Sequence, residues 1–413
     1  MSVTTAFEKL RYLAPAADYE PAEEVGPGGV VVRQAHHTSV RQIHGESSLQ
    51  ACSPSNPSNL NLEGMISHAT LPGGKRFPML KTLQTSACER DCFYCPFRAG
   101  RDFRRVTFSP DELAALVQRF YRSGAVKGLF LSSGVAGGGV RTQDRLIHTA
   151  EILRARYRFD GYIHLKLMPG AEFAQVERAM QLADRVSVNL ESPTSKALAR
   201  LAPHKQLVEE LVQPLRYVEQ IRQAQGGQPG SWANPYRSGP SQTTQFVVGP
   251  GGETDRELLH TTAYLRRTVR LARVYFSAFR PVPDTPLQDQ PAESATRQRR
   301  LYQSDFLLRD YGFGFDELVF DDDGNLPADA DPKLVWARRH LSHSPVEINQ
   351  AERRELLRVP GIGPVGVERI LRARKLGRLR ALNDLHKLGV VTKRVAPFVL
   401  LDGRRPTHQL RLW

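Results

Sequence analysis

The sequence has few cysteines and no long apolar run. Only 4 of its 413 residues are Cys, which excludes the disulfide framework of a small secreted protein. No run of eighteen apolar residues occurs, and the first residues lack the basic stretch and apolar core of a secretory signal. We therefore expect a soluble protein of the reducing cytoplasm with no membrane partner and, at this length, two or three domains.

Acidic residues are scarce at the C-terminal end of the chain. The net charge is +14, and the 80 residues from Leu334 to Trp413 hold 17 Lys and Arg against 6 Asp and Glu, so this stretch carries +11. The stretch Phe315 to Asp331, immediately before it, holds seven acidic residues and no basic one. A positive charge concentrated in this way is typical of a module that binds phosphate groups.

The cysteines that are present form one compact motif. Cys88, Cys92 and Cys95 are separated by three and two residues. Three thiolates at this spacing can ligate a four-iron, four-sulfur cluster, which normally takes four Cys, so one iron stays open. A structural zinc site is the alternative, although zinc sites usually repeat such a pair further along the chain and no second pair exists. A fourth zinc ligand would come from Cys52, His36, His37 or His68.

The motif resembles that of the radical S-adenosylmethionine (SAM) superfamily, in which the amino and carboxylate groups of SAM chelate the open iron. Tyr94, an aromatic residue just before the third Cys, is part of the resemblance. The resemblance implies a [4Fe-4S] cluster on the three Cys and SAM as cofactors, with the Tyr94 backbone near the adenine. An electron donor such as flavodoxin or ferredoxin is then a required partner.

Short apolar strands alternate with longer helical stretches from Arg76 to about Pro286, which is the pattern of parallel βα units. Six such units fit the partial barrel of radical SAM enzymes. We therefore expect an α/β chain with a partial (β/α)6 radical SAM barrel and a small all-α C-terminal domain. The predicted strands cover residues 79–84, 128–132, 162–167, 185–190, 244–248 and 274–279.

One of these strands alternates apolar and polar residues, with Ser187, Asn189 and Glu191 on one face. A wholly buried parallel strand would read as a continuous apolar run, so the alternation predicts a functional barrel lumen; a half-exposed edge strand is the alternative. Barrel active sites lie at the C-terminal ends of the strands. The candidate substrate residues there are His164, Lys166, Gln245, Tyr275 and Ser277, of which Lys166 and Tyr275 are the candidate catalytic residues.

Composition divides the chain into four segments. Residues 1–70 are rich in Pro, Gly, Ser and Asn and predict a loop-rich extension, whereas residues 71–290 hold the barrel. Residues 291–345 hold an amphipathic helix over 297–311 and an exposed acidic loop. Residues 346–413 form the basic module.

Within the basic module, Glu355–Leu371 resembles a helix-hairpin-helix unit, and a weaker copy follows at 385–391. Two glycines allow a tight turn with positive φ, and the helix after the turn starts with free backbone N–H groups that can hold a phosphate. We expect this module to bind nucleic acid, and DNA in particular; a purely structural helix connection is the alternative. The candidate binding residues are Gly361, Ile362, Gly363, Arg369, Arg372, Arg374 and Lys375.

A radical generator joined to a phosphate-binding module resembles one family, the DNA modification or repair radical SAM proteins that end in a helix-hairpin-helix domain and are linked to uracil-DNA glycosylase. The resemblance covers Gly64–Arg405, with specific stretches at 128–135, 161–170, 331–337 and 360–364. It implies uracil-DNA glycosylase as a partner. Where many radical SAM enzymes have two glycines and a glutamate after the second strand, this chain has two serines and a glycine. The implied SAM contacts come from Ser132, Ser133, Gly134, Asn189, Glu191 and Gly249.

Together these features predict an enzyme that cleaves SAM to a 5'-deoxyadenosyl radical and abstracts a hydrogen atom from a nucleotide in DNA. A base inside a duplex cannot enter a barrel, so the substrate is expected to be single-stranded, damaged or flipped out. Two alternatives stay open, which are an RNA- or tRNA-modifying radical SAM enzyme and a non-enzymatic metal-containing protein that binds DNA. Cys52 cannot anchor a second cluster by itself, which disfavours sulfur insertion.

Overall fold

The computed structural model describes residues 3–17, 66–70, 76–225 and 239–407. The chain divides into two compact units. The first unit comprises residues 1–251 and 266–292, and the second comprises residues 252–265 and 293–413. The boundaries expected from composition, at residues 70, 290 and 345, stay predictions.

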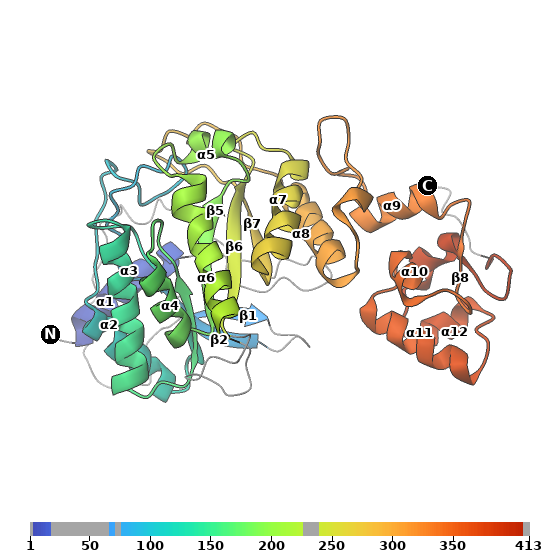
Figure 1. The fold of residues 1–413 in the computed structure, drawn as a ribbon, viewed down its shortest axis with the longest axis horizontal. Helices are drawn as coiled ribbons and strands as arrows, with labels where there is room; N and C mark the ends of the chain where they lie inside the picture. The colour runs from blue at the N-terminus through green and yellow to red at the C-terminus, as the bar shows by residue number, and fades with distance from the viewer. Residues whose placement is uncertain (1–2, 18–65, 71–75, 226–238, 408–413) are drawn as a thin grey trace, which may run out of the picture. The chain divides into compact units, whose positions relative to one another are not determined.

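A seven-stranded sheet forms the centre of the first unit (Figure 1). Its strands follow one another in chain order, with the first antiparallel to the second and the other six parallel. This order confirms the predicted α/β class and the partial barrel of six parallel strands. The strands are β1 (Ile66–Thr70), β2 (Arg76–Leu83), β3 (Gly128–Ser132), β4 (Tyr162–Lys166), β5 (Arg185–Glu191), β6 (Ser241–Val248) and β7 (Arg273–Ala278).

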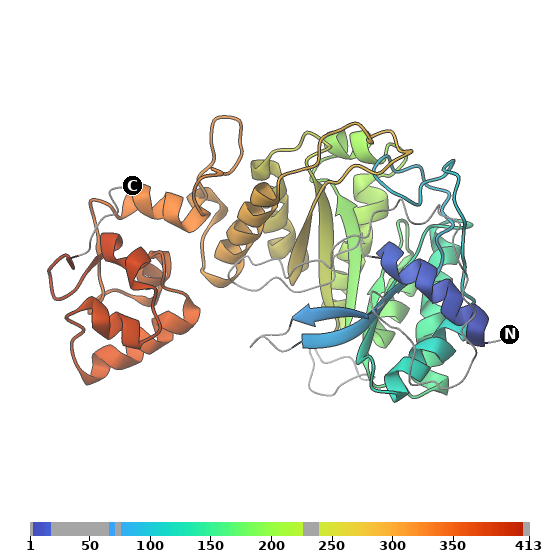
Figure 2. The same cartoon turned by 180° about the vertical axis from the view of Figure 1, so that it is seen from behind.

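Helices cover one face of this sheet. They lie in front of the strands in Figure 1, whereas the strands face the viewer in Figure 2. Thr149, on one of these helices, donates to the Gln84 Oε1 atom at the end of β2 at 2.8 Å. The helices are α2 (Pro110–Arg122), α3 (Gly139–Glu151), α4 (Phe173–Leu182), α5 (Ser195–Leu201) and α6 (Gln213–Ala224), with π-helical turns at Ile152–Arg156 and Leu207–Val212.

Helix α2 illustrates how the local sequence sets these elements. Ser109 caps its N-terminus and accepts the Glu112 N–H at 3.2 Å, while the Glu112 carboxylate accepts the Ser109 N–H, which completes a capping box. Leu113, Val117 and Phe120 recur at helical spacing and are buried. The capped end and the apolar stripe together fix where the helix starts and which face packs inward.

The N-terminal 70 residues, predicted as a loop-rich extension, include two regular elements that the prediction did not specify. Residues Val3–Ala16 form helix α1, in which Leu10 and Leu13 are buried, and residues 66–70 form β1. Lys9 of α1 pairs with Glu112 of α2 at 2.7 Å. The Pro, Gly and Ser content of the whole segment obscured the helical spacing of its first apolar residues. Residues 18–65 lie outside the described part of the chain.

The second unit is built mainly of helices around its own apolar core. Leu356, Val359, Ile362, Val367 and Ile370 are at most 1% exposed in that core. The helix predicted over 297–311 is confirmed. The helices are α7 (Asp255–Val269, which begins in this unit), α8 (Ala295–Asp310), α9 (Pro332–His340), α10 (Arg353–Arg358), α11 (Pro364–Leu376), α12 (Leu382–Lys387) and α13 (Thr392–Val395), with a parallel pair β8 (Val346–Glu347) and β9 (Val399–Leu400). Of the helices in the described ranges, none is long and apolar enough to cross a membrane.

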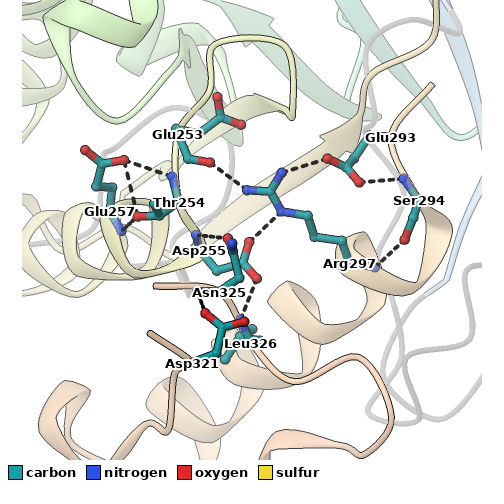
Figure 3. Close-up of polar contacts among 10 residues, drawn as sticks. All are labelled: Glu253, Thr254, Asp255, Glu257, Glu293, Ser294, Arg297, Asp321, Asn325 and Leu326. Atoms are coloured by element: carbon teal, nitrogen blue, oxygen red, sulfur yellow. Dashed lines mark hydrogen bonds and ion pairs between the residues drawn. The ribbon is translucent and has the colours of Figure 1, made fainter. Parts of the chain in front are cut away.

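A buried carboxylate organises the acidic part of the second unit (Figure 3). Asp255, 1% exposed, accepts from Arg297 Nε at 2.7 Å and from the Leu326 N–H at 2.9 Å. Burial raises the pKa of Asp255, and the charge of Arg297 opposes that rise. Asn325 Oδ1 accepts the Asp255 N–H at 3.3 Å, and Asp321 Oδ1 accepts the Asn325 N–H at 2.7 Å. The predicted acidic loop is exposed, and these contacts fold it into a fixed turn.

Candidate functional site

The three cysteines lie on one loop that leaves the C-terminal end of β2, and we call residues 88–98 the cysteine loop. Cys92 is buried, and Cys88 and Cys95 are half-buried. Two backbone N–H groups already point at sulfur atoms: Val135 N–H donates to Cys88 Sγ and Phe97 N–H to Cys95 Sγ, each at 3.4 Å. Such donors favour a thiolate, which is the form that binds iron.

Hydrogen bonds connect the loop after β3 to the cysteine loop. The carboxylate of Glu89 accepts the N–H groups of Gly137 and Gly138 at 3.1 Å, and the Glu89 N–H donates to the Val135 carbonyl at 2.8 Å. Gly134 approaches so closely that a Cβ atom there would lie 2.3 Å from the Ala87 carbonyl oxygen. Glycine at position 134 is therefore required for packing, whatever it contributes to SAM binding.

Arg105 is a residue of the site that the sequence analysis missed. Its Nη1 atom donates to the carbonyls of Ser86 and Phe97 at 2.9 and 2.7 Å, and its Nη2 atom donates to those of Arg98 and Arg101 at 2.8 and 3.2 Å. Burial lowers the pKa of Arg105, while the nearby Cys88 and Cys95 thiols act in the opposite direction. One guanidinium thus sets the shape of the cysteine loop and places a positive charge beside two of its sulfur atoms.

The segment after α5 holds the loop from the other side. Phe93 N–H donates to the Leu201 carbonyl at 2.7 Å, and Arg90 pairs with Glu210 at 2.5 Å. From the same segment, Lys205 enters the site and pairs with Glu191 at 3.0 Å. No sequence signal marked Lys205, because it stands in a short connection among other polar residues.

Burial and the neighbouring charges shift the pKa values around Cys92 in opposite directions. Burial raises the pKa of the Cys92 thiol, and Lys205 opposes that rise. For Lys205 itself, burial lowers the pKa, but the negative charges of Cys92 and Glu191 together raise it well above its ordinary value. Burial, and then the Glu191 carboxylate, raise the pKa of the Tyr94 hydroxyl. Lys205 therefore stays charged, and it offsets part of the rise that burial causes in the pKa of Cys92.

Glu191 reaches this position through an irregularity at the end of β5. The register shifts between Asn189 and Glu191, so that Glu191 pairs with Phe246 instead of continuing the alternation. Its φ angle is +62°, which is strained for a residue with a Cβ atom. The prediction that Glu191 shares a face with Ser187 and Asn189 by simple alternation is therefore wrong, because the bulge redirects its side chain. Backbone strain of this kind is typical of functional positions.

The other predicted SAM residues lie at the ends of neighbouring strands. Ser132 ends β3 and is buried, and Ser133 Oγ donates to the carbonyl of Gly134 at 2.7 Å. Gly249 follows β6 with a φ of +113°, a conformation that favours glycine. Asn189 accepts a hydrogen bond from Lys166.

The predicted substrate residues lie on the inner face of the sheet, which we define as the side carrying Phe130, His164, Lys166, Ser187 and Asn189, opposite the helices. His164 Nε2 and Ser187 Oγ are hydrogen-bonded at 2.7 Å. The same alternation and register place Gln245, Tyr275 and Ser277 on this face, and Tyr275 Oη accepts from Arg185 at 3.4 Å. Lys166 and Tyr275, the candidate catalytic residues, are both buried here.

The predicted nucleic-acid residues divide into internal and exposed groups. Arg374 Nη1 donates to the carbonyls of Ile348 and Ala351 at 3.2 and 2.6 Å, so this guanidinium holds the unit together. Arg369 is exposed, and its Nη1 atom donates to the Leu388 carbonyl at 3.1 Å. Arg372 and Lys375 are also exposed on α11.

The turn between α10 and α11, residues 359–363, is the glycine turn. Its positive φ occurs at Gly361 alone, at +89°, and a Cβ atom there would lie 2.9 Å from the Val391 carbonyl oxygen. Gly363 has an ordinary φ of −106°, so the prediction that both glycines serve a positive φ is wrong for Gly363. The Ile362 carbonyl accepts from the buried Lys333 Nζ at 2.6 Å.

The possible metal ligands around the cysteine loop fit an iron-sulfur cluster better than a zinc ion. Within the described residues, no three Cys, His, Asp or Glu side chains converge on one metal position. A four-iron cluster spreads its thiolates over different irons, whereas zinc gathers four ligands around one centre. Ser192 Oγ, next to Glu191, is buried without a hydrogen-bond partner in the described part of the chain, and a bound polar ligand would satisfy it. His68 lies exposed on β1, and the other proposed zinc ligands, Cys52, His36 and His37, lie outside the described residues.

The cysteine loop and the parallel strands that follow it match one family, described as the radical SAM superfamily, over residues 83–265. Residues 83–265 thus resemble a radical SAM domain. The match supports the predicted radical SAM enzyme and its two cofactors, because the family uses a [4Fe-4S] cluster and SAM. Cys88, Cys92 and Cys95 would hold the cluster in this domain.

Several solved structures resemble the chain at low identity. Methylornithine synthase (PylB) is 13% identical, with a TM-score of 0.44 over 56% of this chain and 61% of that chain. The FeFe-hydrogenase maturase HydG from Carboxydothermus hydrogenoformans is 14% identical, with a TM-score of 0.41 over 54% and 49%. The methyltransferase TsrM from Kitasatospora setae is 12% identical, with a TM-score of 0.38 over 50% and 38%. The chain thus spans less than two thirds of each, and no curated protein matches it.

Proposed function

We propose that the chain reductively cleaves SAM at a [4Fe-4S] cluster and uses the resulting radical to act on DNA, in its modification or repair. The observation that carries this proposal is the cysteine loop, whose thiols interact electrostatically with two cations, Arg105 and Lys205, that come from separate parts of the chain. When bound, the cluster supplies the electron that breaks a carbon–sulfur bond of SAM. A cytoplasmic electron donor of the flavodoxin or ferredoxin kind would be its source.

The residues around the loop have separable tasks in this proposal. Cys88, Cys92 and Cys95 hold the cluster. Arg105 fixes the loop through its four carbonyl contacts, and its charge, with that of Lys205, offsets the negative charge of the thiolates. Glu191 and the neighbouring strand ends offer polar groups to SAM. The buried position of Cys92 keeps water away from the chemistry.

The second unit supports DNA as the substrate. Arg369, Arg372 and Lys375 present exposed positive charges on α11, and the N-terminus of that helix follows the glycine turn, where backbone N–H groups precede the first helical hydrogen bond. Contacts of this kind hold a phosphate backbone and do not read sequence. Uracil-DNA glycosylase, the partner implied by the resemblance, belongs to the same repair context.

Hydrogen transfer from labelled nucleic acid tests the proposal. The full chain, loaded with its cluster without oxygen, is incubated with reductant, SAM and oligonucleotides deuterated in the sugar and base. Deuterium in 5'-deoxyadenosine with single-stranded or mismatched DNA is the expected result, because a base in an intact duplex cannot enter the barrel. Deuterium from matched RNA alone would replace DNA with RNA as the substrate. SAM cleavage without any transfer from either would contradict a nucleic-acid substrate.

A further inference from the structure

A buried lysine lies against the glycine turn of the second unit. Lys333 is 7% exposed, and its Nζ atom donates to the Ile362 carbonyl at 2.6 Å. The same atom lies 4.6 Å from the centre of the Tyr311 ring. All three residues belong to the second unit. The contact between the lysine and the turn is therefore part of the fold of that unit.

The N-terminus of α9 fixes the position of this lysine. Asp331 caps the helix, and its Oδ1 atom accepts the Leu334 N–H at 3.1 Å. The Oδ2 atom of Asp331 accepts from Arg394 of α13. Arg394 also borders the glycine turn, since a Cβ atom added at Gly361 would lie 3.0 Å from the Arg394 Cβ atom. The same helix end thus connects the turn to two cations, Lys333 through the chain and Arg394 through an ion pair.

The contact with Lys333 sets the direction of one peptide group in the turn. The peptide bonds of the described residues are all trans, and in a trans peptide the C=O and N–H groups point in opposite directions. The Ile362 carbonyl points at the Lys333 ammonium, so the Gly363 N–H of the same peptide points away from it. Gly363 directly precedes α11, and no side chain caps that helix. The Gly363 N–H therefore joins the N–H groups at the start of α11 that have no acceptor within the helix.

The charged groups that face the ammonium, besides the ring and the carbonyl, are two cations and two carboxylates. Burial lowers the pKa of Lys333 to about 7, and Arg394 lowers it further. The Asp331 carboxylate opposes this shift, whereas Arg358, itself paired with Glu317 at 2.7 Å, adds to it. A buried ammonium costs free energy unless negative charge or hydrogen bonds compensate it. A phosphate at the glycine turn would bring negative charge close to Lys333 and favour its charged form.

From this geometry we infer that Lys333 is a positioning residue for DNA binding, whose buried ammonium holds the glycine turn with the Gly363 N–H directed at a backbone phosphate. Lys333 does not touch the phosphate itself. The inference rests on the proposed function and adds an internal residue to the DNA-binding surface. If phosphate favours the charged form of Lys333, the charged form favours phosphate by the same factor. DNA binding should therefore take up a proton and weaken as the pH rises through about 7.

Calorimetric titration of the cluster-loaded full chain with single-stranded DNA, on both sides of pH 7, tests the inference. Buffers of different ionisation enthalpy give the number of protons taken up. Lys333→Met removes the charge at similar length and should lower the affinity below pH 7 about tenfold and abolish the proton uptake. Lys333→Arg stays charged at every pH used, so it should keep the affinity without the proton uptake. Lys375→Met, the matched exposed control on α11, should lower the salt slope by about 1 and keep the proton uptake.

Equal affinity or equal proton uptake in the unchanged chain and in Lys333→Met would overturn the inference and leave the proposed function in place. The histidines of the chain are the same in every variant, so the difference between variants isolates Lys333. Circular dichroism shows whether each variant is folded. If Lys333→Met is unfolded, Lys333→Arg decides, because a pH dependence equal to that of the unchanged chain would also overturn the inference. Absence of DNA binding by the unchanged chain would instead remove DNA from the proposed function, and the inference with it.

Discussion

The cysteine loop and the glycine turn are both short motifs, and their surroundings use positive charge differently. At the cysteine loop, Arg105 comes from shortly after the loop and Lys205 from the segment after α5, and both act on the thiols. Around the glycine turn, Lys333 and Arg374 are bound to backbone carbonyls and stabilise the unit itself. Arg374 belongs to the stretch 334–413 that carries +11, so only part of that charge is available to a ligand. Net charge identifies a basic module, but contacts decide which of its charges face a partner.

The largest effect is expected at the cysteine loop. Cys92→Ala should remove the cluster entirely, because two thiolates do not replace three as ligands. Iron and sulfide content after anaerobic loading, with the absorbance of the cluster, provides the measurement. Ser192→Ala is the matched control, since Ser192 lies nearby without being a cluster ligand in this account. A Cys92→Ala protein with full iron content would contradict the assignment.

In the second unit, we expect Arg297 to be the internal cation whose loss lowers the free energy of unfolding most. Arg297→Met leaves the buried carboxylate of Asp255 without its partner, which should lower the free energy of unfolding by about 3 kcal/mol. Arg299→Met removes an exposed charge two residues away and should change stability little. Denaturant unfolding of both variants measures this difference in stability. Equal unfolding midpoints would show that the Arg297–Asp255 ion pair does not stabilise the unit.

The glycine turn offers a smaller test of conformation. Gly361→Ala puts a Cβ atom at a φ of +89° and against the Val391 carbonyl, so unfolding should become easier by about 1–2 kcal/mol. Gly363→Ala, at an ordinary φ, should cost less. The two thermal midpoints are to be compared in the full chain. A larger loss for Gly363→Ala would mean that crowding against the Tyr311 hydroxyl, which would lie 3.2 Å from the added Cβ atom, outweighs backbone strain.

The smallest expected effect is a change in the salt dependence of DNA binding. It should occur when an exposed cation is removed and be absent when an internal cation is removed. Arg372→Ala should reduce the salt slope of DNA binding by about 1 for each lost phosphate contact and leave stability unchanged. Arg374→Ala should lower stability, because two carbonyls lose their donor, with no change in the salt slope. Fluorescence anisotropy with DNA and RNA at several salt concentrations measures the slope. Identical slopes for the unchanged chain and Arg372→Ala would remove that residue from the phosphate surface.

Much of the first unit was predictable, since the periods of strand and helix and the cysteine spacing are local signals. Strand β3 was predicted at its observed bounds, residues 128–132. Lys205 was not predictable, because its role arises only when the cysteine loop and the segment after α5 come together. Arg105 was missed because it binds backbone carbonyls, which leave no signal in the sequence. The direction of Glu191 was missed because a bulge breaks the period of the strand. Helix α1 was missed because the composition of a long segment was averaged over its apolar beginning.

We propose that radical generation and nucleic-acid binding belong to separate surfaces of one chain. The most direct test measures 5'-deoxyadenosine formation and single-stranded DNA affinity side by side in Cys92→Ala and in the double variant Arg372→Ala with Lys375→Ala. We expect Cys92→Ala to lose SAM cleavage and keep DNA affinity, and the double variant to keep SAM cleavage and lose affinity. A variant that loses both properties while remaining folded would contradict the claim, and so would a double variant that binds DNA as tightly as the unchanged chain.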